Sequence, residues 1–365
     1  MEMYILNQTM STIYITDIQT KIQLKSPYLL VFHNQELRQK ININQVNQIV
    51  LWGRCYLPRE VASLALFRHI PILFVGNNGE NLGRLEHRSK QQPQCLKYQK
   101  RRSLDHEFTF ATAESIVPAK LHNCYVILQR LTTNKSTPII KIASDLLLLL
   151  IDDLPMANSV YSLREYVTMA ASFYYPALAS LLPCGFGFKG RKKQPPTDGI
   201  NCLLNLGYSL LHQKIEALLQ DLELHPNWGN LYSNSHHQSP LACDFMAEFR
   251  APIVDELVTF LVMSEILTPS DFLPDVKQGG VSLNPGILKV FFQYWEDKLQ
   301  TQVIHHDAGK VSYRHCLQLQ LKEYIASLVG NTVSYRPMLL PINSPSADVH
   351  TTEKQETKVL SLVKR

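Results

Sequence analysis

The stretch GNLYSNSHHQSPLACDFMAEFRAPIVD (Gly229–Asp255) carries most of the chemical information in this chain. It passes from a polar, histidine-bearing loop into a helix predicted to begin near Leu241, with apolar residues at three- and four-residue spacing. Asp244 and Glu248 lie four residues apart, so their carboxylates share one face of that helix. Beside a loop histidine, such a pair can bind a divalent cation. A surface helix with a solvated acidic face explains the same pattern, and the pattern alone favours that simpler interpretation.

The length of the chain predicts two domains, because 365 residues exceed what one hydrophobic core usually serves. An apolar fraction of 45% and a charged fraction of 18% are typical of an ordinary folded protein and exclude the disordered and fibrous classes. The formal net charge of +5 permits nucleic-acid binding without requiring it. The local grouping of basic residues therefore matters more than their total.

The cysteines and the longest apolar run indicate a cytoplasmic protein without membrane association. The seven cysteines are scattered and include no C-x-x-C pair, which is typical of reduced thiols and not of a disulfide framework. The apolar run Ile139–Leu154 is interrupted by Lys141, Ser144 and Asp145 and is too short to cross a bilayer. It predicts a buried helix.

Residues 11–87 are predicted to form a β-rich domain, because short runs of Ile, Val, Tyr and Phe alternate there with Pro, Asn and Gly. The predicted strands are Ser11–Asp17, Lys21–Lys25, Tyr28–His33, Gln45–Trp52, Ile70–Val75 and Asn81–Glu86. One helix, Pro58–Arg68, interrupts them, with Pro58 in its first turn.

Residues 88–105 are predicted to form a basic linker. Its basic residues include Arg88, Lys97, Lys100, Arg101 and Arg102. A linker that faces DNA and a solvated hinge explain this composition equally well.

From residue 106 to residue 337 the apolar period becomes helical, which predicts an all-α domain. The expected helices are Ala111–Leu131, Pro138–Ile151, Leu163–Leu182, Asp198–Leu222, Leu241–Ser264, Gly286–Leu299 and Tyr313–Val329. Residues 338–365 lack periodicity and are predicted to be a disordered tail. The fold class expected is therefore α+β, a β-rich domain followed by a larger helical one.

Several segments, in order, resemble one family: the CRISPR adaptation integrase, the nuclease-like subunit that inserts new spacer DNA. The segments are IPILFVGNNGENLGRLE (Ile70–Glu86), AKLHNCYVILQR (Ala119–Arg130), FGFKGRKKQPPTDGINCLLNLGYSLL (Phe186–Leu211), HPNWGNLY (His225–Tyr232) and LACDFMAEFRAPIVD (Leu241–Asp255). These segments lie between Ile70 and Asp255, and the resemblance as a whole covers roughly Ser11 to Pro337.

This resemblance implies a DNA endonuclease or integrase that depends on Mg or Mn. It also implies that the β domain builds a homodimer, and that the homodimer assembles with a small ferredoxin-like partner and duplex DNA. The family's metal ligands are a Glu on one helix, a His after G-x-L, and an acid three residues beyond the Asp of D-L-M-E-E-F-R.

This sequence departs from the family at all three metal-ligand positions. Val167 stands at the glutamate position of LREYV, Tyr232 at the histidine position of GNLY, and Ala247 at the second acid of DFMAEFR. Valine and alanine cannot bind a metal, and a neutral phenol is a poor ligand. We therefore expect an impaired copy without a metal cofactor, one that binds DNA and acts beside an intact paralogue or alone.

The alternative is an active enzyme with shifted ligands. The first acid of the motif, Asp244, is retained, as is Glu248, and His236 and His237 follow Tyr232 in a loop. In that case Mg or Mn would still be required.

Other charged residues have simpler expected roles. Arg191, Lys192 and Lys193 stand in a glycine-flanked loop and are predicted to contact phosphate. Arg250 is predicted to pair with a neighbouring carboxylate, and Asp198 to cap a helix. The sequence His305-His306-Asp307 resembles a metal cluster, but a polar hairpin between two helices is the better interpretation.

Overall fold

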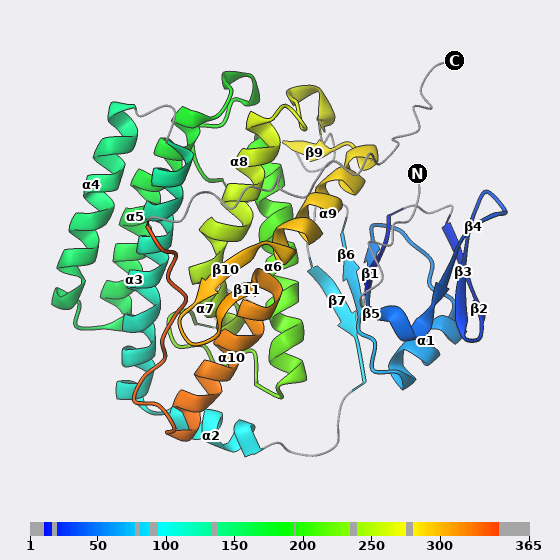
Figure 1. Ribbon diagram of the computed structural model, residues 1–365, viewed down its shortest axis with the longest axis horizontal. Helices are drawn as coiled ribbons and strands as arrows, with labels where there is room; N and C mark the ends of the chain where they lie inside the picture. Colours follow the sequence, from blue (N-terminus) through cyan, green and yellow to red (C-terminus); the bar gives the residue numbers. More distant parts are fainter. Residues whose placement is uncertain are drawn as a thin grey trace.

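The computed structural model describes residues 11–16, 20–76, 81–87, 94–132, 137–192, 195–233, 239–274 and 280–342. Two strand-built layers lie beside a larger body of helices (Figure 1), which confirms the predicted α+β class. All seven cysteines are free thiols. Within the described part of the chain, no helix is both long and apolar enough to cross a membrane.

The N-terminal part contains two sheets. A four-stranded sheet has the order β1 (Ser11–Ile15), β5 (Val46–Trp52), β6 (Ile72–Val75) and β7 (Asn81–Leu85). Its first three strands are parallel, and helix α1 (Arg59–Phe67) provides the crossover between β5 and β6; β7 returns antiparallel to β6. The second sheet is an antiparallel meander of β2 (Thr20–Lys25), β3 (Tyr28–His33) and β4 (Glu36–Asn42).

Both faces of the four-stranded sheet are buried, as is usual for parallel strands. On β1, Ile13 and Ile15 join the core shared with the meander and α1, whereas Tyr14 points the other way into the core of the helical part. Val50 and Trp52 on β5 repeat this alternation. The sheet therefore joins the two parts of the molecule through a continuous buried surface.

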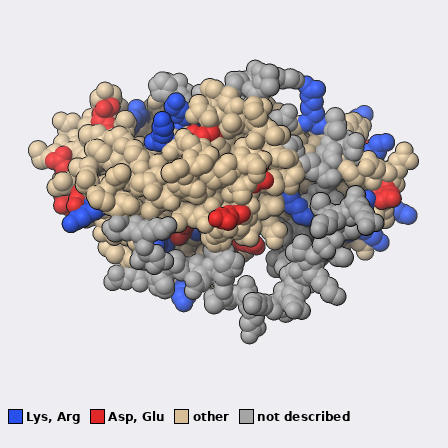
Figure 2. All heavy atoms as spheres, turned by 90° about the horizontal axis from the view of Figure 1, so that it is seen from above, with Lys and Arg blue, Asp and Glu red and all other residues tan. Residues whose placement is uncertain are grey.

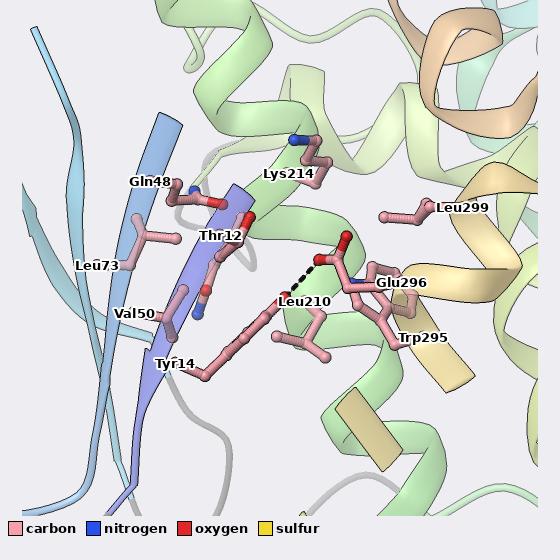
Figure 3. A pocket seen from close by; sticks show the side chains of 11 residues that line it. Thr12, Tyr14, Gln48, Val50, Leu73, Leu210, Lys214, Trp295, Glu296 and Leu299 are labelled. Atoms are coloured by element: carbon pink, nitrogen blue, oxygen red, sulfur yellow. Dashed lines mark hydrogen bonds between the residues drawn. The ribbon is translucent and has the colours of Figure 1, made fainter. Parts of the chain in front are cut away.

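Figure 3 shows that joint at close range, with Tyr14 reaching from β1 toward the helices. The Tyr14 hydroxyl donates a 2.8 Å hydrogen bond to Glu296, and its ring stacks on Phe292 with centroids 4.3 Å apart. Tyr14 and Glu296 line a small pocket at this joint together with Lys214. Burial lowers the pKa of Lys214 to about 8. Polar groups therefore fix the register of the sheet against the helices.

The helical body is built from nine helices within the described residues. They are α2 (Gln94–Arg102), α3 (His106–Leu131), α4 (Pro138–Asp153), α5 (Val160–Leu181), α6 (Gly199–Asp221), α7 (Pro240–Phe249), α8 (Glu256–Met263), α9 (Pro285–Gln300) and α10 (Tyr313–Val329). Side-chain caps begin several of them; Asp198 accepts from the Asn201 N–H at 2.8 Å, as the sequence predicts. Helices α3, α4 and α5 pack together as one layer (Figure 1).

Four features differ from the sequence prediction. Strand β4 was not expected, and the predicted linker contains helix α2, which packs on α10. The predicted helix Leu241–Ser264 is divided into α7, a π turn and α8. The helical part also contains an unexpected short hairpin, β8 (Phe272–Pro274) with β9 (Val281–Leu283), besides the expected one of β10 (Gln302–His305) with β11 (Gly309–Ser312).

The segment after α10 is ordered beyond the predicted boundary of the disordered tail. We call Tyr335–Ile342 the strap. Met338 and Leu340 are each 1% exposed, and the Asn123 side chain on α3 donates to the Met338 carbonyl (3.0 Å) and accepts from the Leu340 N–H (2.9 Å). Because these bonds hold the backbone in place, a tail that begins at residue 338 is wrong; residues 343–365 lie outside the described part.

Candidate functional site

The stretch Gly229–Asp255 contains α7 and a six-residue π turn (Arg250–Asp255), and α8 follows directly. Pro252 has no N–H to donate, so the helical ladder widens there. All residues of α7 are buried, and Asp244, Glu248 and Asp255 are each 1% exposed. The interpretation as a surface helix with a solvated acidic face is therefore wrong.

The carboxylate of Asp244 fixes the loop that precedes α7. It accepts hydrogen bonds from the backbone N–H groups of Asn230, Leu231 (3.2 Å) and Tyr232 (2.9 Å). Burial raises its pKa to about 7, against the effect of these donors. Asp244 thus uses both oxygens to hold residues 230–232 onto the helix.

The carboxylate of Glu248 fixes a different segment, the strap. Its Oε1 accepts from the Tyr335 hydroxyl at 2.6 Å, and its Oε2 accepts from the Met338 N–H and from the Gln320 amide at 3.4 Å. Burial raises the pKa of Glu248 to about 8. The two acids that the sequence places on one helix face therefore serve two separate hydrogen-bond networks.

Short contacts link the three segments that carry Val167, Tyr232 and Ala247. Arg164, one helical turn before Val167 on α5, donates a 2.5 Å hydrogen bond to the carbonyl of Leu231, the neighbour of Tyr232. Tyr232 is bound through its own N–H to Asp244, one turn before Ala247 on α7. Helices α5 and α7 therefore both contact the loop that carries Tyr232.

The residues at these three positions do not fit a divalent metal. Val167 and Tyr232 are partly buried against the apolar core, and Ala247 is 2% exposed within it. They provide neither a carboxylate nor an imidazole, and the nearby Asp244 already uses both oxygens. Glu165, the acid two residues before Val167, is exposed; two residues correspond to about 200° around a helix, so it faces away from Val167. His236 and His237 lie outside the described residues.

Elsewhere in the described part of the chain, one group of side chains has metal-ligand spacing: His306, Asp307 and Glu323, on the surface. The Arg336 guanidinium already lies between its two carboxylates, 2.5 Å from Asp307 and 3.1 Å from Glu323. His306 belongs to the turn of the β10–β11 hairpin, so the polar-hairpin interpretation of this sequence is confirmed.

A buried tyrosine cluster lies beyond the π turn, and sequence reasoning missed it. Asp255 accepts from the hydroxyls of Tyr174 (3.0 Å) and Tyr208, and Tyr208 shares a 2.9 Å hydrogen bond with Tyr175. Burial raises the pKa of Asp255 to about 6. The Arg250 guanidinium lies 5.4 Å from the centre of the Tyr208 ring. Arg250 follows α7 directly, so the cluster adjoins the C-terminal end of that helix.

The Gly207-Tyr208 pair in α6 is a sequence signal that could have pointed to this cluster. A Cβ on Gly207 would lie 2.5 Å from a methyl group of Val254, so only glycine lets α6 approach the π turn this closely. That approach places Tyr208 against Asp255. The pattern was visible, but its partner, 47 residues further along the chain, was not.

A family model described as CRISPR associated protein Cas1 matches residues 13–297. The chain belongs to the Cas1 family. It is 26% identical over 335 residues to CRISPR-associated endonuclease Cas1 1 of Thermus thermophilus, which covers 90% of this chain and 99% of that relative. The resemblance seen in the sequence is thereby confirmed.

Two solved structures share the Cas1-like fold of this chain. A casposase bound to its integration product superposes with a TM-score of 0.79 at 18% identity, over 91% of this chain and 95% of the other. A chain of a Cas6-RT-Cas1–Cas2 complex gives a TM-score of 0.78 at 19% identity, over 92% of this chain but 37% of that longer one. At such identities the likeness establishes the fold.

Within this Cas1-family fold, the predicted phosphate-binding loop is partly anchored to its own helix. The Arg191 guanidinium donates to the side-chain carbonyls of Asn201 (3.0 Å) and Asn205 (2.6 Å) and lies 5.2 Å from the centre of the Tyr208 ring. Lys192 is exposed, and Lys193 lies outside the described residues. Arg191 therefore shapes the loop in addition to any contact that it makes with phosphate.

Helix α2 presents the other predicted basic group. Lys97, Lys100 and Arg101 are exposed on it at a spacing of three and four residues, which places them on one face. Arg102 turns inward, to Asp105 (3.0 Å) and the Leu328 carbonyl. Arg88 lies outside the described residues. On the face shown in Figure 2, Lys and Arg side chains stand apart and do not merge into one band.

Proposed function

We propose that this Cas1-family chain is a DNA-binding subunit of a CRISPR spacer-acquisition complex that lacks a working metal centre of its own. The residue types at Val167, Tyr232 and Ala247, on three segments linked by short contacts, carry this proposal. Divalent-metal catalysis on phosphates requires carboxylate or imidazole ligands, and these three positions offer only two apolar side chains and a neutral phenol, which is a poor ligand.

Binding of duplex DNA is supported by the placement of exposed cations. Lys97, Lys100 and Arg101 form a basic ridge on one face of α2, which itself is fixed to the helical body. The buried Gln99 exchanges two hydrogen bonds with the backbone of His225 (2.9 and 2.7 Å). A ridge on a fixed helix binds phosphates with little loss of conformational entropy. Together with Lys192, it constitutes the proposed DNA surface.

The proposed partners are those of the family. The β-rich part would form the homodimer, and a small ferredoxin-like protein would complete the assembly. One structural neighbour comes from a complex that contains Cas2, which supports this arrangement. Because the chain lacks a metal centre, we propose that an intact paralogue supplies catalysis where integration occurs.

The alternative, an active enzyme with shifted ligands, has less support. Asp244 and Glu248 would have to release the 230–232 loop and the strap before either could bind a metal. Each release would leave buried N–H groups without partners, at about 1–3 kcal/mol per group. His236 and His237 alone would not complete a site.

The decisive experiment compares the purified protein with the triple variant Val167→Glu, Tyr232→His and Ala247→Glu. Both are assayed for nicking and for integration of a labelled spacer duplex in Mn²⁺ and in Mg²⁺. We expect the wild-type protein to be inert and the variant to gain metal-dependent activity, because the fold that positions the ligands is retained.

A matched control separates charge from bulk. The triple variant Val167→Gln, Tyr232→Phe and Ala247→Gln introduces side chains of similar size without metal-binding charge, and it should stay inert. If the wild-type protein cuts DNA and Asp244→Ala abolishes that cutting, the proposal of a missing metal centre is wrong.

A further inference from the structure

The outer face of α4 carries an apolar stripe. Ile139, Ile142, Leu146 and Leu149 follow one another at intervals of three, four and three residues, the spacing of a helix seam that packs against another segment. Ile139, Ile142 and Leu149 are 52%, 59% and 61% exposed. No described residue covers them.

The opposite face of α4 is already used. Ile140, Ala143 and Leu147 are buried against the layer formed with α3 and α5, and α4 lies at the outer edge of that layer (Figure 1). The outer stripe is therefore additional to what the fold of the helical body requires. Aliphatic side chains at such spacing usually mark a contact.

The charges beside the stripe are mostly acidic. Asp145 and Asp152 are exposed and lie seven residues apart, so they line the same side of the helix. Lys141 is the one exposed base among the residues of α4. An occupant with aliphatic and basic side chains would complement this face.

The chain supplies such an occupant. The strap ends on α3, where Arg130 donates to the Pro341 carbonyl (3.1 Å) and the His122 ring bonds the Leu340 carbonyl (2.8 Å). Helix α3 packs directly on α4. From Ile342, the chain as far as Val359 can reach roughly 50 Å when extended, far more than the width of one helix.

The sequence beyond the strap has the required composition. Val359, Leu360, Leu362 and Val363 place four aliphatic side chains within the run KVLSLVKR, and Lys358, Lys364 and Arg365 flank them. We propose that residues 358–365 dock on the outer stripe of α4 of the same chain, with the bases beside Asp145 and Asp152. This contact is independent of any catalytic activity.

Site-specific photo-crosslinking tests the proposal on the full-length protein. A benzophenone amino acid replaces Leu149, and after irradiation the captured peptide is identified by mass spectrometry. We expect capture of the peptide that contains Leu360 and Leu362. In an equal mixture of isotopically light and heavy protein, each crosslinked peptide pair should be entirely light or entirely heavy, because the contact forms within one chain.

Variants of the C-terminal segment establish specificity. Leu360→Asp with Leu362→Asp should lower the crosslink about tenfold, since a carboxylate is not tolerated in an apolar contact. Ser361→Asp adds the same charge between them, on a side chain not assigned to the contact, and should retain most of it. A benzophenone at Phe67, which is 78% exposed on α1, should not capture this peptide.

Each remaining outcome overturns the proposal. Crosslinks between light and heavy chains would assign the stripe to a second copy. Capture of another peptide, or capture that Leu360→Asp with Leu362→Asp does not change, would show that residues 358–365 do not cover α4. The absence of any capture would show the same.

Discussion

The Tyr335 hydroxyl donates a 2.6 Å hydrogen bond to Glu248, although 87 positions separate the two residues. The same carboxylate accepts a hydrogen bond from the Met338 N–H. Glu248 on α7 therefore holds the strap through one side-chain donor and one backbone donor. In the family motif this acid stands beside a metal ligand. In this structure its carboxyl group bonds to other residues of the protein. Its protonation should therefore change the stability of the folded state.

The stability of the protein should fall as pH rises between about 4.5 and about 8, because burial raises the pKa of Glu248 from an ordinary 4.5 to about 8. In that window the folded state keeps a proton that the unfolded state releases. The slope from one such group is at most about 1.4 kcal/mol per pH unit. Urea denaturation at several pH values measures the slope, to which Asp244 and Asp255 contribute in the same direction.

The share that belongs to Glu248 is isolated by Glu248→Gln, which should flatten the pH dependence. Glu165→Gln is the matched control, since Glu165 is an exposed acid on α5. A slope that is the same in wild type and Glu248→Gln would contradict the assignment.

Gly207→Ala should destabilise the protein by about 1–3 kcal/mol, because the added methyl group meets Val254 at 2.5 Å across a close helix crossing. Chemical denaturation measures the change. Gly286→Ala is the control: its nearest neighbour would be an Asn284 oxygen at 3.5 Å, so its stability should stay within about 0.5 kcal/mol of wild type. Equal stability of the two variants would argue against the close approach of α6 to the π turn.

Mn²⁺ should leave the thermal unfolding midpoint of the wild-type protein unchanged, since a ligand stabilises only a state that binds it. In Val167→Glu, Tyr232→His, Ala247→Glu the midpoint should rise by a few degrees at saturating Mn²⁺. Differential scanning fluorimetry measures both. Ca²⁺ and Na⁺ at matched ionic strength serve as controls, and a clear Mn²⁺ shift in wild type would reveal a metal site that the described residues do not form.

Replacement of the α2 ridge, Lys97→Ala with Lys100→Ala and Arg101→Ala, should weaken binding to duplex DNA of any sequence. It should also reduce the slope of log affinity against log salt by about one unit per lost phosphate contact. Fluorescence anisotropy across salt concentrations gives both quantities. Lys21→Ala with Lys25→Ala and Lys310→Ala removes three exposed bases elsewhere and should change neither. Equal losses in both triple variants would indicate a non-specific effect of net charge.

The sequence predicted the helices and strands better than it predicted the distant residues that they contact. Apolar periodicity located the other N-terminal strands and the long helices. Strand β4 was not predicted because its sequence, ELRQKIN, is largely polar, as edge strands often are. Helix α2 escaped because its composition is that of a solvated linker. Its anchor, the buried Gln99, bonds to His225, 126 positions away.

The site shows the same division. The residues Val167, Tyr232 and Ala247, at which we infer that metal ligands are missing, were singled out from the sequence alone. The burial of Asp244 and Glu248 could not, because their hydrogen-bond donors come from residues 230–232 and from the strap. A carboxylate at a polar helix position looks solvated until a distant segment is known to cover it.

The strap has a consequence for how the protein is made. Asn123 on α3 is paired with the backbone of Leu340, 217 residues later, and Glu248 receives Tyr335 and Met338 only when that part of the chain exists. During synthesis on the ribosome, the helices from α3 to α10 emerge first, before the strap groups that these two side chains bind. The nascent helical body therefore remains incomplete until translation has passed residue 340, and premature termination before the strap would release a chain in which the buried Glu248 carboxylate keeps only the Gln320 amide as a donor.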